Sequence, residues 1–249
     1  MVKIEKMASG RKIVVPGETI VSGDAFLPGE GAYRDGKDLV AGRYGLSDIS
    51  EKFVKVIAVS GVYIPRRGNS IIGEVIGITF NGWLVNFGGA ENAFLSMMEV
   101  PRYINKGELR EHFDFGDLIS AKVWNTNGKG VDLSVKMRGF GRLEGGQLMQ
   151  INPNKVPRII GREGSMVNLI KDATGCEINV GQNGWVWIRG GSIDNEIQTR
   201  KIIDFICENA TITGLTDKVE KFIKDMGIRK GVEIIAENTH KEKKVKEKK

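Results

Sequence analysis

Two short helical patterns joined by a Gly-x-x-Gly element constrain the fold of this 249-residue chain more than any other feature. Val156, Ile159 and Ile160 lead into Gly161-Arg162-Glu163-Gly164, and a second helical pattern follows. Gly175 ends that helix at a position that commonly needs a positive φ. We predict two strands next, over 176–180 and 185–189, with a Gly-rich turn between them.

This order of elements resembles the core of the KH (K homology) domain, in which the Gly-x-x-Gly turn approaches about four nucleotides closely. The resemblance implies RNA-binding residues in and beside the turn: Arg158, Gly161, Arg162, Gly164 and Lys171. Glu163 acts against phosphate binding because both groups are negative. A functional clamp and a partly structural role therefore both stay open for this element. A plain helix–turn–helix is the simpler alternative, and the strand pair that follows argues against it.

A second glycine element, Gly181-Gln182-Asn183-Gly184, lies between two strands. A tight hairpin with Asn183-Gly184 as its left-handed pair accounts for it. We therefore assign Gly181, Asn183 and Gly184 to a structural turn. Trp185 and Trp187 share one face of the following strand, and we expect them to pack on a helix or on a neighbouring barrel.

A second group of strands lies upstream of this region. We predict five strands, over 70–79, 83–87, 92–95, 116–124 and 131–135, with hairpins at Asn81-Gly82 and Asn127-Gly128. Five strands with a detour between the third and the fourth are typical of the Greek-key barrel of an OB-fold. The segments GEVIGITFNGWLVNFGG, GDLISAKV and GVDLSVK resemble the S1 variety of that fold, which binds RNA.

Barrels of this kind bind single-stranded RNA through aromatic side chains that stack on bases and through a basic rim. The candidate residues here are Arg66, Arg67, Phe80, Asn81, Trp83, Lys122, Trp124, Asn125, Asn127 and Lys129. Asn81 departs from the S1 pattern, in which an aromatic residue often precedes the hairpin glycine, so base stacking on this face stays open. For Trp83 and Trp124, packing in the core or against another subunit is an equal alternative.

The first 60 residues show short β-type segments punctuated by glycine, which favours a small β-barrel or sandwich that acts as a docking module. The expected fold class is multidomain and mostly β, with an α/β C-terminal part. The expected divisions are an N-terminal domain at 1–60, an S1 barrel at 62–138, a KH domain at 146–235 and a disordered lysine-rich tail at 236–249.

The net charge of +6 is not spread evenly over the chain. Residues 236–249 carry six basic and three acidic side chains, so half of the excess lies there. RNA affinity must then come from local patches and not from bulk charge. With two cysteines, Cys176 and Cys207, neither a zinc ribbon nor a disulfide framework can form, and buried thiols of a cytoplasmic protein are expected. No apolar run is long enough to cross a membrane, and residues 1–10 lack the apolar core of a signal peptide.

Catalytic motifs are missing from the sequence. It has two histidines, His112 and His240, and no G-x-x-x-x-G-K-[ST] phosphate loop. Glu111, Asp114 and Asp117 lie close together, but in a segment that reads as a turn. We therefore expect no catalytic residue, no metal, no cofactor and no enzymatic activity.

A β-domain followed by S1 and a single KH domain resembles the RNA-binding cap subunit of the exosome, the Rrp-four family of archaea and eukaryotes. The specific motifs are Val15-Pro16-Gly17, Phe80-Asn81-Gly82-Trp83 and Gly181-Gln182-Asn183-Gly184. The compact size and the lysine-rich tail resemble the archaeal members.

The resemblance implies three caps on a hexameric ring of RNase PH-like subunits, with N-terminal domains docked on the ring and S1 domains around its pore. The caps would recruit single-stranded RNA, and the ring would degrade it from 3′ to 5′. A NusA-like transcription factor or another stand-alone S1/KH protein is the alternative, although NusA carries two KH domains. Polynucleotide phosphorylase places KH before S1, the reverse of the order here.

Overall fold

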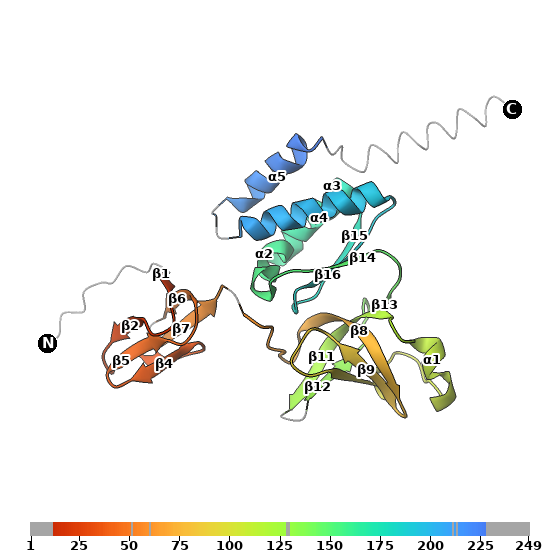
Figure 1. The fold of residues 1–249 in the computed structure, drawn as a ribbon, viewed down its shortest axis with the longest axis horizontal. Coiled ribbons are helices and arrows are strands. Elements are labelled where there is room, and N and C mark those ends of the chain that lie inside the picture. Colours follow the sequence, from red (N-terminus) through yellow and green to blue (C-terminus); the bar gives the residue numbers. More distant parts are fainter. Residues whose placement is uncertain are drawn as a thin grey trace. The chain divides into compact units, whose positions relative to one another are not determined.

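The computed structural model describes residues 12–50, 52–59, 61–127, 130–210, 212 and 214–227, without the side chains of Lys106 and Asn127. The chain forms two compact units, Met1–Gly61 and Val62–Lys249 (Figure 1). The predicted tail at 236–249 lies outside the described residues. The further boundary that we predict between 138 and 146 stays a prediction.

The N-terminal unit is a sandwich of two small sheets. One has the order β1-β6-β7-β3, with bounds Lys12–Val14, Gly45–Ile49, Phe53–Ala58 and Leu27–Pro28. The other has the order β2-β5-β4, with bounds Thr19–Ser22, Asp38–Ala41 and Ala32–Asp35. Its core is small and contains Val14, Ala41 and Val56. Val54 and Val56 are buried while Phe53, Lys55 and Ile57 are exposed, which is the alternation of a strand covered on one face.

The second unit begins with a closed five-stranded barrel, as expected for an OB-fold. Its strands are β8 (Ser70–Thr79), β9 (Gly82–Asn86), β10 (Ala93–Ser96), β11 (Leu118–Asn127) and β12 (Gly130–Ser134). The order is β12-β10-β9-β8-β11, and β12 also pairs with β11, which closes the barrel. The predicted detour holds η1 (Met97–Glu99), η2 (Lys106–Glu108) and α1 (Leu109–His112). Side chains that alternate inward form the core, among them Val75, Val85, Ile119 and Leu133.

The glycine-rich segment after the barrel contains a short strand. Gly141–Leu143 forms β13, which pairs antiparallel with the first residues of β11, Leu118 to Ser120. This pairing adds a sixth strand to the sheet of the barrel. The sequence pattern did not show this strand, because three residues between glycines carry no readable alternation.

The C-terminal part is an α/β layer with the element order expected of a KH domain. The sheet β14-β16-β15 is covered by helices on one face (Figure 1). The elements in chain order are β14 (Gln147–Gln150), η3 (Pro153–Lys155), α2 (Val156–Ile160), η4 (Arg162–Gly164), α3 (Ser165–Thr174), β15 (Glu177–Val180), β16 (Trp185–Arg189), α4 (Ile193–Glu208) and α5 (Leu215–Asp225). The mostly β architecture with an α/β C-terminal part is therefore confirmed.

Ser192 caps helix α4, because the Ser192 hydroxyl accepts from the Asn195 backbone N–H at 3.3 Å. Ile197 is exposed on this helix, whereas Ile202, Ile203 and Ile206 are buried. None of the described helices is long and apolar enough to cross a membrane.

Candidate nucleic-acid interface

Two predicted RNA-binding residues meet on the barrel. Trp124 lies on β11 with 53% of its surface exposed, and the Arg67 guanidinium carbon lies 5.2 Å from the centre of its ring. The pairing of β11 with β12 shifts register between Val123 and Asn125, which is a β-bulge. A bulge interrupts the in–out alternation of a strand. Trp124 and Asn125 are therefore both exposed, while Val123 is buried.

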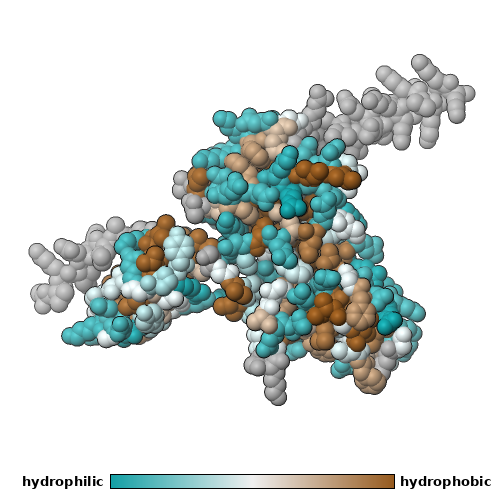
Figure 2. Space-filling view, viewed as in Figure 1, coloured by the Kyte–Doolittle hydropathy of each residue, from teal (hydrophilic) through white to brown (hydrophobic). Residues whose placement is uncertain are grey.

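The β8–β9 hairpin carries Phe80 and Asn81. Phe80 is 74% exposed, so its ring faces solvent. Asn81 braces the hairpin: its carbonyl accepts from the Met97 N–H at 2.9 Å, and its side chain accepts from the Thr79 hydroxyl at 3.4 Å. Figure 2 shows apolar groups on the surface over the barrel, and its exposed large side chains include Phe80, Met98, Tyr103, Phe115 and Trp124.

The prediction that Trp83 contacts RNA is wrong. Its side chain is fully buried, and its indole Nε1–H donates to the Phe113 carbonyl at 2.9 Å. The ring packs edge-on against Phe113, with 5.2 Å between centroids. Trp83 follows the hairpin glycine on the inward face of β9, so it belongs to the barrel core.

The remaining predicted residues of the barrel lie in different environments. Arg66 is exposed next to Arg67, and Asn125 is exposed on the bulge. Lys122 is half-buried, and its Nζ lies 3.4 Å from the Met137 sulfur. The side chain of Asn127 and all of Lys129 lie outside the described residues.

A groove of about 340 Å³ adjoins Trp124 on the barrel surface, and we call it the Trp124 groove. It is lined by Phe94, Ser96, Met98, Glu99, Trp124, Asp132, Leu133 and Lys136. Sequence reasoning did not select Phe94 or Asp132. The available signal was the outward position of both residues in the alternation of their strands. Their direct pairing in register between β10 and β12 is visible only in the structure.

An ion pair forms one rim of the Trp124 groove. The Lys136 Nζ lies 3.0 Å from the Glu99 carboxylate. Burial acts to raise the pKa of Glu99, but hydrogen bonds with Ser134 and Lys136 outweigh it and leave that pKa below its ordinary value. Glu99 is therefore ionised at neutral pH and neutralises Lys136.

The Gly-x-x-Gly turn has the geometry of a tight backbone turn. A Cβ on Gly161 would lie 2.6 Å from the Met166 nitrogen, so this glycine is required by packing against its own following helix. Glu163 has φ +53°. Among the described residues it is the one non-glycine residue whose φ is positive. Arg158 and Arg162 are exposed beside it. Two cations and one carboxylate thus share the surface of this turn.

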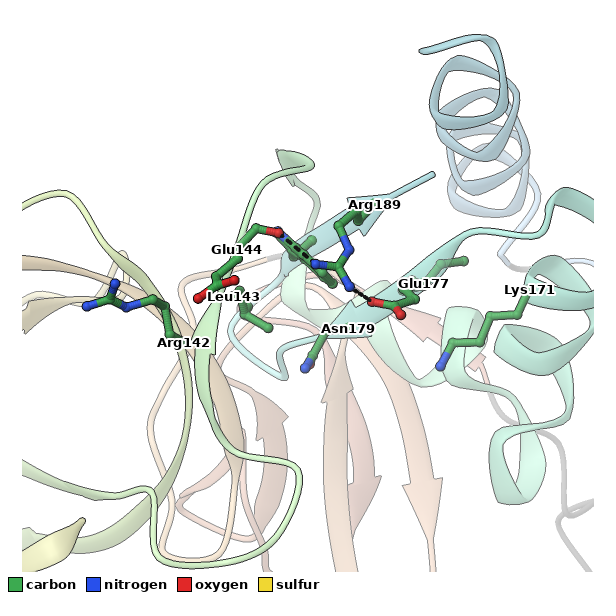
Figure 3. A pocket seen from close by; sticks show the side chains of 9 residues that line it. Arg142, Leu143, Glu144, Lys171, Glu177, Asn179 and Arg189 are labelled. Carbon is green, nitrogen blue, oxygen red and sulfur yellow. Dashed lines mark hydrogen bonds and ion pairs between the residues drawn. The ribbon is translucent and has the colours of Figure 1, made fainter. Parts of the chain in front are cut away.

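Lys171 lines a separate cleft of about 350 Å³, at which β13 of the barrel sheet meets β15 and β16 (Figure 3). Its side chain extends toward Glu177 and Asn179, whereas Arg142 points away from that group. Arg189 is held by the Glu177 carboxylate at 2.7 Å and the Glu144 carbonyl at 3.2 Å. Arg142 pairs with Asp117 at 2.7 Å. Two of the three cations around this cleft are therefore already neutralised.

The Gly181–Gly184 turn contacts the barrel and not only its own hairpin. The Asn183 amide nitrogen donates to the carbonyls of Ile72 and Phe87, each at 2.8 Å, and its oxygen accepts from the Ile72 N–H at 3.2 Å. We expected left-handed backbone at both Asn183 and Gly184, but of these two residues only Gly184 has a positive φ, +85°. A Cβ on Gly181 would lie 2.8 Å from the Ile72 nitrogen, so glycine is needed for the close approach of β8.

The two strand tryptophans complete this contact. Trp185 and Trp187 are buried in a cluster with Ile72 of the barrel, as expected for a face that packs on a neighbouring barrel. The Trp187 Nε1–H donates to the Gly145 carbonyl at 2.7 Å. The barrel and the KH-type layer therefore share a buried interface.

Comparison with known proteins agrees with this architecture. Residues 146–194 match the model of the KH domain family. A crystal structure attributed to an exosome complex RNA-binding protein superposes with a TM-score of 0.59 at 31% identity, over 66% of this chain and 97% of that one. Exosome complex component Rrp4 of Thermococcus kodakarensis is 39% identical over 219 residues, which are 86% of this chain and 85% of the relative. The chain belongs to the Rrp4 family.

Rrp4 of Methanothermus fervidus gives a similar result, with 38% identity over 86% of this chain and 95% of the relative. Membership in the Rrp4 family favours an exosome component over a NusA-like factor. Within the described part of this Rrp4-family chain, no group of three or more His, Cys, Asp and Glu side chains is arranged to hold a metal ion.

Proposed function

We propose that this protein is a non-catalytic, RNA-binding cap subunit of the exosome. It recruits single-stranded RNA and passes it to a phosphorolytic ring of RNase PH-like subunits for 3′-to-5′ degradation and processing. Three copies sit on each six-membered ring, and the assembly works in the cytoplasm. The observation that carries the proposal is the 39% identity to an exosome complex component Rrp4 over 86% of the chain.

The barrel supplies the first RNA contacts in this proposal. Arg66 and Arg67 bind phosphate, and Trp124 stacks on a base. Phe80, Lys122 and Asn125 add further contacts. The exposed Arg67–Trp124 pair supports this assignment, because guanidinium groups and aromatic rings are the side chains on which single-stranded RNA commonly stacks. Asn127 and Lys129 are proposed to contact RNA as well.

The KH turn supplies a weaker contact. Arg158 and Arg162 attract phosphate, and the Glu163 carboxylate offsets part of that charge. Lys171 acts in the cleft that it lines with Arg189 and not in the turn itself.

The N-terminal unit supplies the docking surface. On the outer face of the sheet β1-β6-β7-β3, Ile13 pairs in register with Leu46, and Leu46 with Ile57. A second apolar pair, Leu27 and Phe53, lies on the same sheet. Large side chains here are half exposed, among them Ile13, Leu27 and Phe53, and an apolar sheet face of this kind is typical of protein interfaces.

Purification from the host tests the proposal. The protein should copurify with RNase PH-like subunits, and the pure subunit alone should be a monomer that does not shorten RNA. Phosphate- or magnesium-dependent shortening by the pure subunit, after contaminants are removed, would contradict the non-catalytic assignment. A partner set built around RNA polymerase would instead support the NusA-like alternative.

A further inference from the structure

The Trp124 groove is lined by both apolar and polar side chains. Phe94 and Met98 lie along it together with Trp124, and Leu133 is the buried member of its lining. Met98 is 77% exposed, so this flexible apolar side chain stands in solvent beside the groove. A flat apolar group fits between such side chains, because aromatic rings and thioethers both pack well on the face of a π-system.

The charges around the groove favour a neutral occupant over a phosphate. Glu99 and Lys136 neutralise each other at 3.0 Å, and Asp132 adds a negative charge to the lining. The positive charge of Arg67 lies over the Trp124 ring. A phosphate is therefore attracted to Arg67 and repelled by Asp132, whereas a base enters the groove without that cost.

Asp132 is the charged lining residue that stands outside the Glu99–Lys136 ion pair. It pairs in register with Phe94 on β10 and with Asn125 on β11, so it lies between two other members of this face. Its carboxylate makes no hydrogen bond or ion pair with a described residue, in contrast to that of Glu99. The Asp132 carboxylate is accessible to water, because the Arg43 Nε is the one buried side-chain polar atom without a partner among the described residues. A base amino group that replaces this water forms a charge-assisted hydrogen bond with the carboxylate.

We propose that the Trp124 groove binds one nucleobase of single-stranded RNA, and that Asp132 selects a base with an exocyclic amino group and disfavours uracil. The inference rests on the proposed RNA-binding function and adds to it the position and the specificity of one subsite. Adenine, cytosine and guanine each present an amino donor to a carboxylate. Uracil presents carbonyl oxygens on both sides of its single N–H, and these repel the carboxylate.

Tryptophan fluorescence tests the position of the base. The chain has four tryptophans, and Trp124 is exposed whereas Trp83, Trp185 and Trp187 are buried. Iodide quenches tryptophan side chains that solvent can reach, which here means Trp124. Saturating oligo(C) should quench the same part of the tryptophan emission, because the bound base covers the Trp124 ring. The variant Trp124→Phe should lose this RNA-dependent quenching but keep RNA binding.

Affinity measurements test the specificity. Wild-type protein should bind oligo(C) or oligo(A) about tenfold more tightly than oligo(U), as expected for one hydrogen bond to a charged group. Asp132→Asn should bring that ratio close to one, because an amide offers both a donor and an acceptor. Trp124→Ala should weaken binding of every homopolymer.

Phe115→Ala is the matched control. Phe115 is also an exposed aromatic residue with an arginine over its ring, Arg110 at 5.9 Å, but it does not line the groove. The Phe115→Ala variant should keep both the RNA affinity and the base preference of the wild-type protein. Circular dichroism of each variant confirms that the barrel is folded.

The outcomes separate the two proposals. If wild-type protein binds no RNA, alone or in the assembled exosome, the proposed function fails. If RNA binds but Asp132→Asn leaves the base preference unchanged, or Trp124→Ala behaves like Phe115→Ala, the subsite is wrong and the proposed function stands. If Trp124→Ala weakens assembly with the ring but not RNA binding, the groove is a protein interface and the inference is overturned.

Discussion

Asn183 and Ile72 exchange two hydrogen bonds although 111 residues separate them. The Asn183 amide nitrogen donates to the Ile72 carbonyl at 2.8 Å, and the Ile72 N–H donates to the Asn183 oxygen at 3.2 Å. The side chain of one turn residue thus imitates a strand partner for β8 of the barrel. Because Asn183 is buried, these bonds are shielded from water, and they join the KH-type layer to the barrel.

Removing this side chain should destabilise the second unit as a whole. Asn183→Ala leaves the Ile72 N–H and two carbonyls without the amide, and each buried group left unpaired costs roughly 1–3 kcal/mol. We expect a loss of about 3 kcal/mol in the free energy of unfolding, measured by urea titration. Gln182→Ala is the control, because Gln182 accepts one exposed bond from Ser70 and should cost less than about 1 kcal/mol. Equal losses in the two variants would refute the bridging role.

The outer sheet face of the N-terminal unit should determine assembly. Deleting residues 1–60 should abolish association with the ring and leave RNA binding by the remainder largely intact. Replacing Phe53 and Ile57 by Asp should weaken association by about tenfold or more, because charges cannot be buried in an apolar contact. Gel filtration with purified ring subunits measures both.

Tyr33→Asp is the control for this surface. Tyr33 is also exposed, but it lies on β4 of the other sheet. The Tyr33→Asp variant should associate with the ring as the wild-type protein does. Association that survives the deletion would show that the docking assignment is wrong.

Phosphate binding should depend more on the barrel than on the Gly-x-x-Gly turn. Replacing Arg66, Arg67 and Lys129 by Ala should weaken single-stranded RNA binding for all sequences alike. It should also flatten the salt dependence by roughly 0.7 per lost contact. Because three caps act together, the measurement belongs in the assembled complex, with salt-titrated binding to oligo(A).

The comparison is the double variant Arg158→Ala, Arg162→Ala. We expect a smaller loss there, because Glu163 already offsets part of the positive charge of the turn. A larger loss from the KH pair than from the barrel triple would make the Gly-x-x-Gly turn the main phosphate site.

Acid should destabilise the barrel through His112. Its ring packs on Phe113 and Trp83, with centroids 4.4 Å and 5.8 Å away. Burial lowers the pKa of His112 below the ordinary 6.5, and the charges of Arg102 and Arg142 lower it further. Below pH 6.5 the unfolded chain then binds more protons than the folded one, so stability falls as the pH drops toward the folded pKa.

Urea titrations between about pH 8 and about pH 5 should show this decline, in the range where histidine titrates. His112→Gln should reduce the slope, because glutamine does not titrate. The other histidine, His240, supplies the control, and His240→Gln should leave the slope as it is. An unchanged slope in His112→Gln would assign the decline to other groups.

The sequence alone determined the order of elements and the family. Helical and strand periods, hairpin glycines and the Gly-x-x-Gly turn depend on interactions between residues close in the chain, so their residue types report them directly. These local signals predicted the barrel strands and the KH-type layer. The family motifs then predicted an exosome subunit.

Only the tertiary structure decided which candidate residues share a surface. Trp83 and Trp124 have the same side chain in similar strand patterns, yet one fills the barrel core and the other is exposed at a bulge. The bulge depends on the pairing of β11 with β12, and the approach of Asn183 to Ile72 depends on the packing of two layers. Such contacts join residues far apart in the chain. The register of paired strands and the packing of layers are set by the burial of whole faces, which no short stretch of sequence encodes.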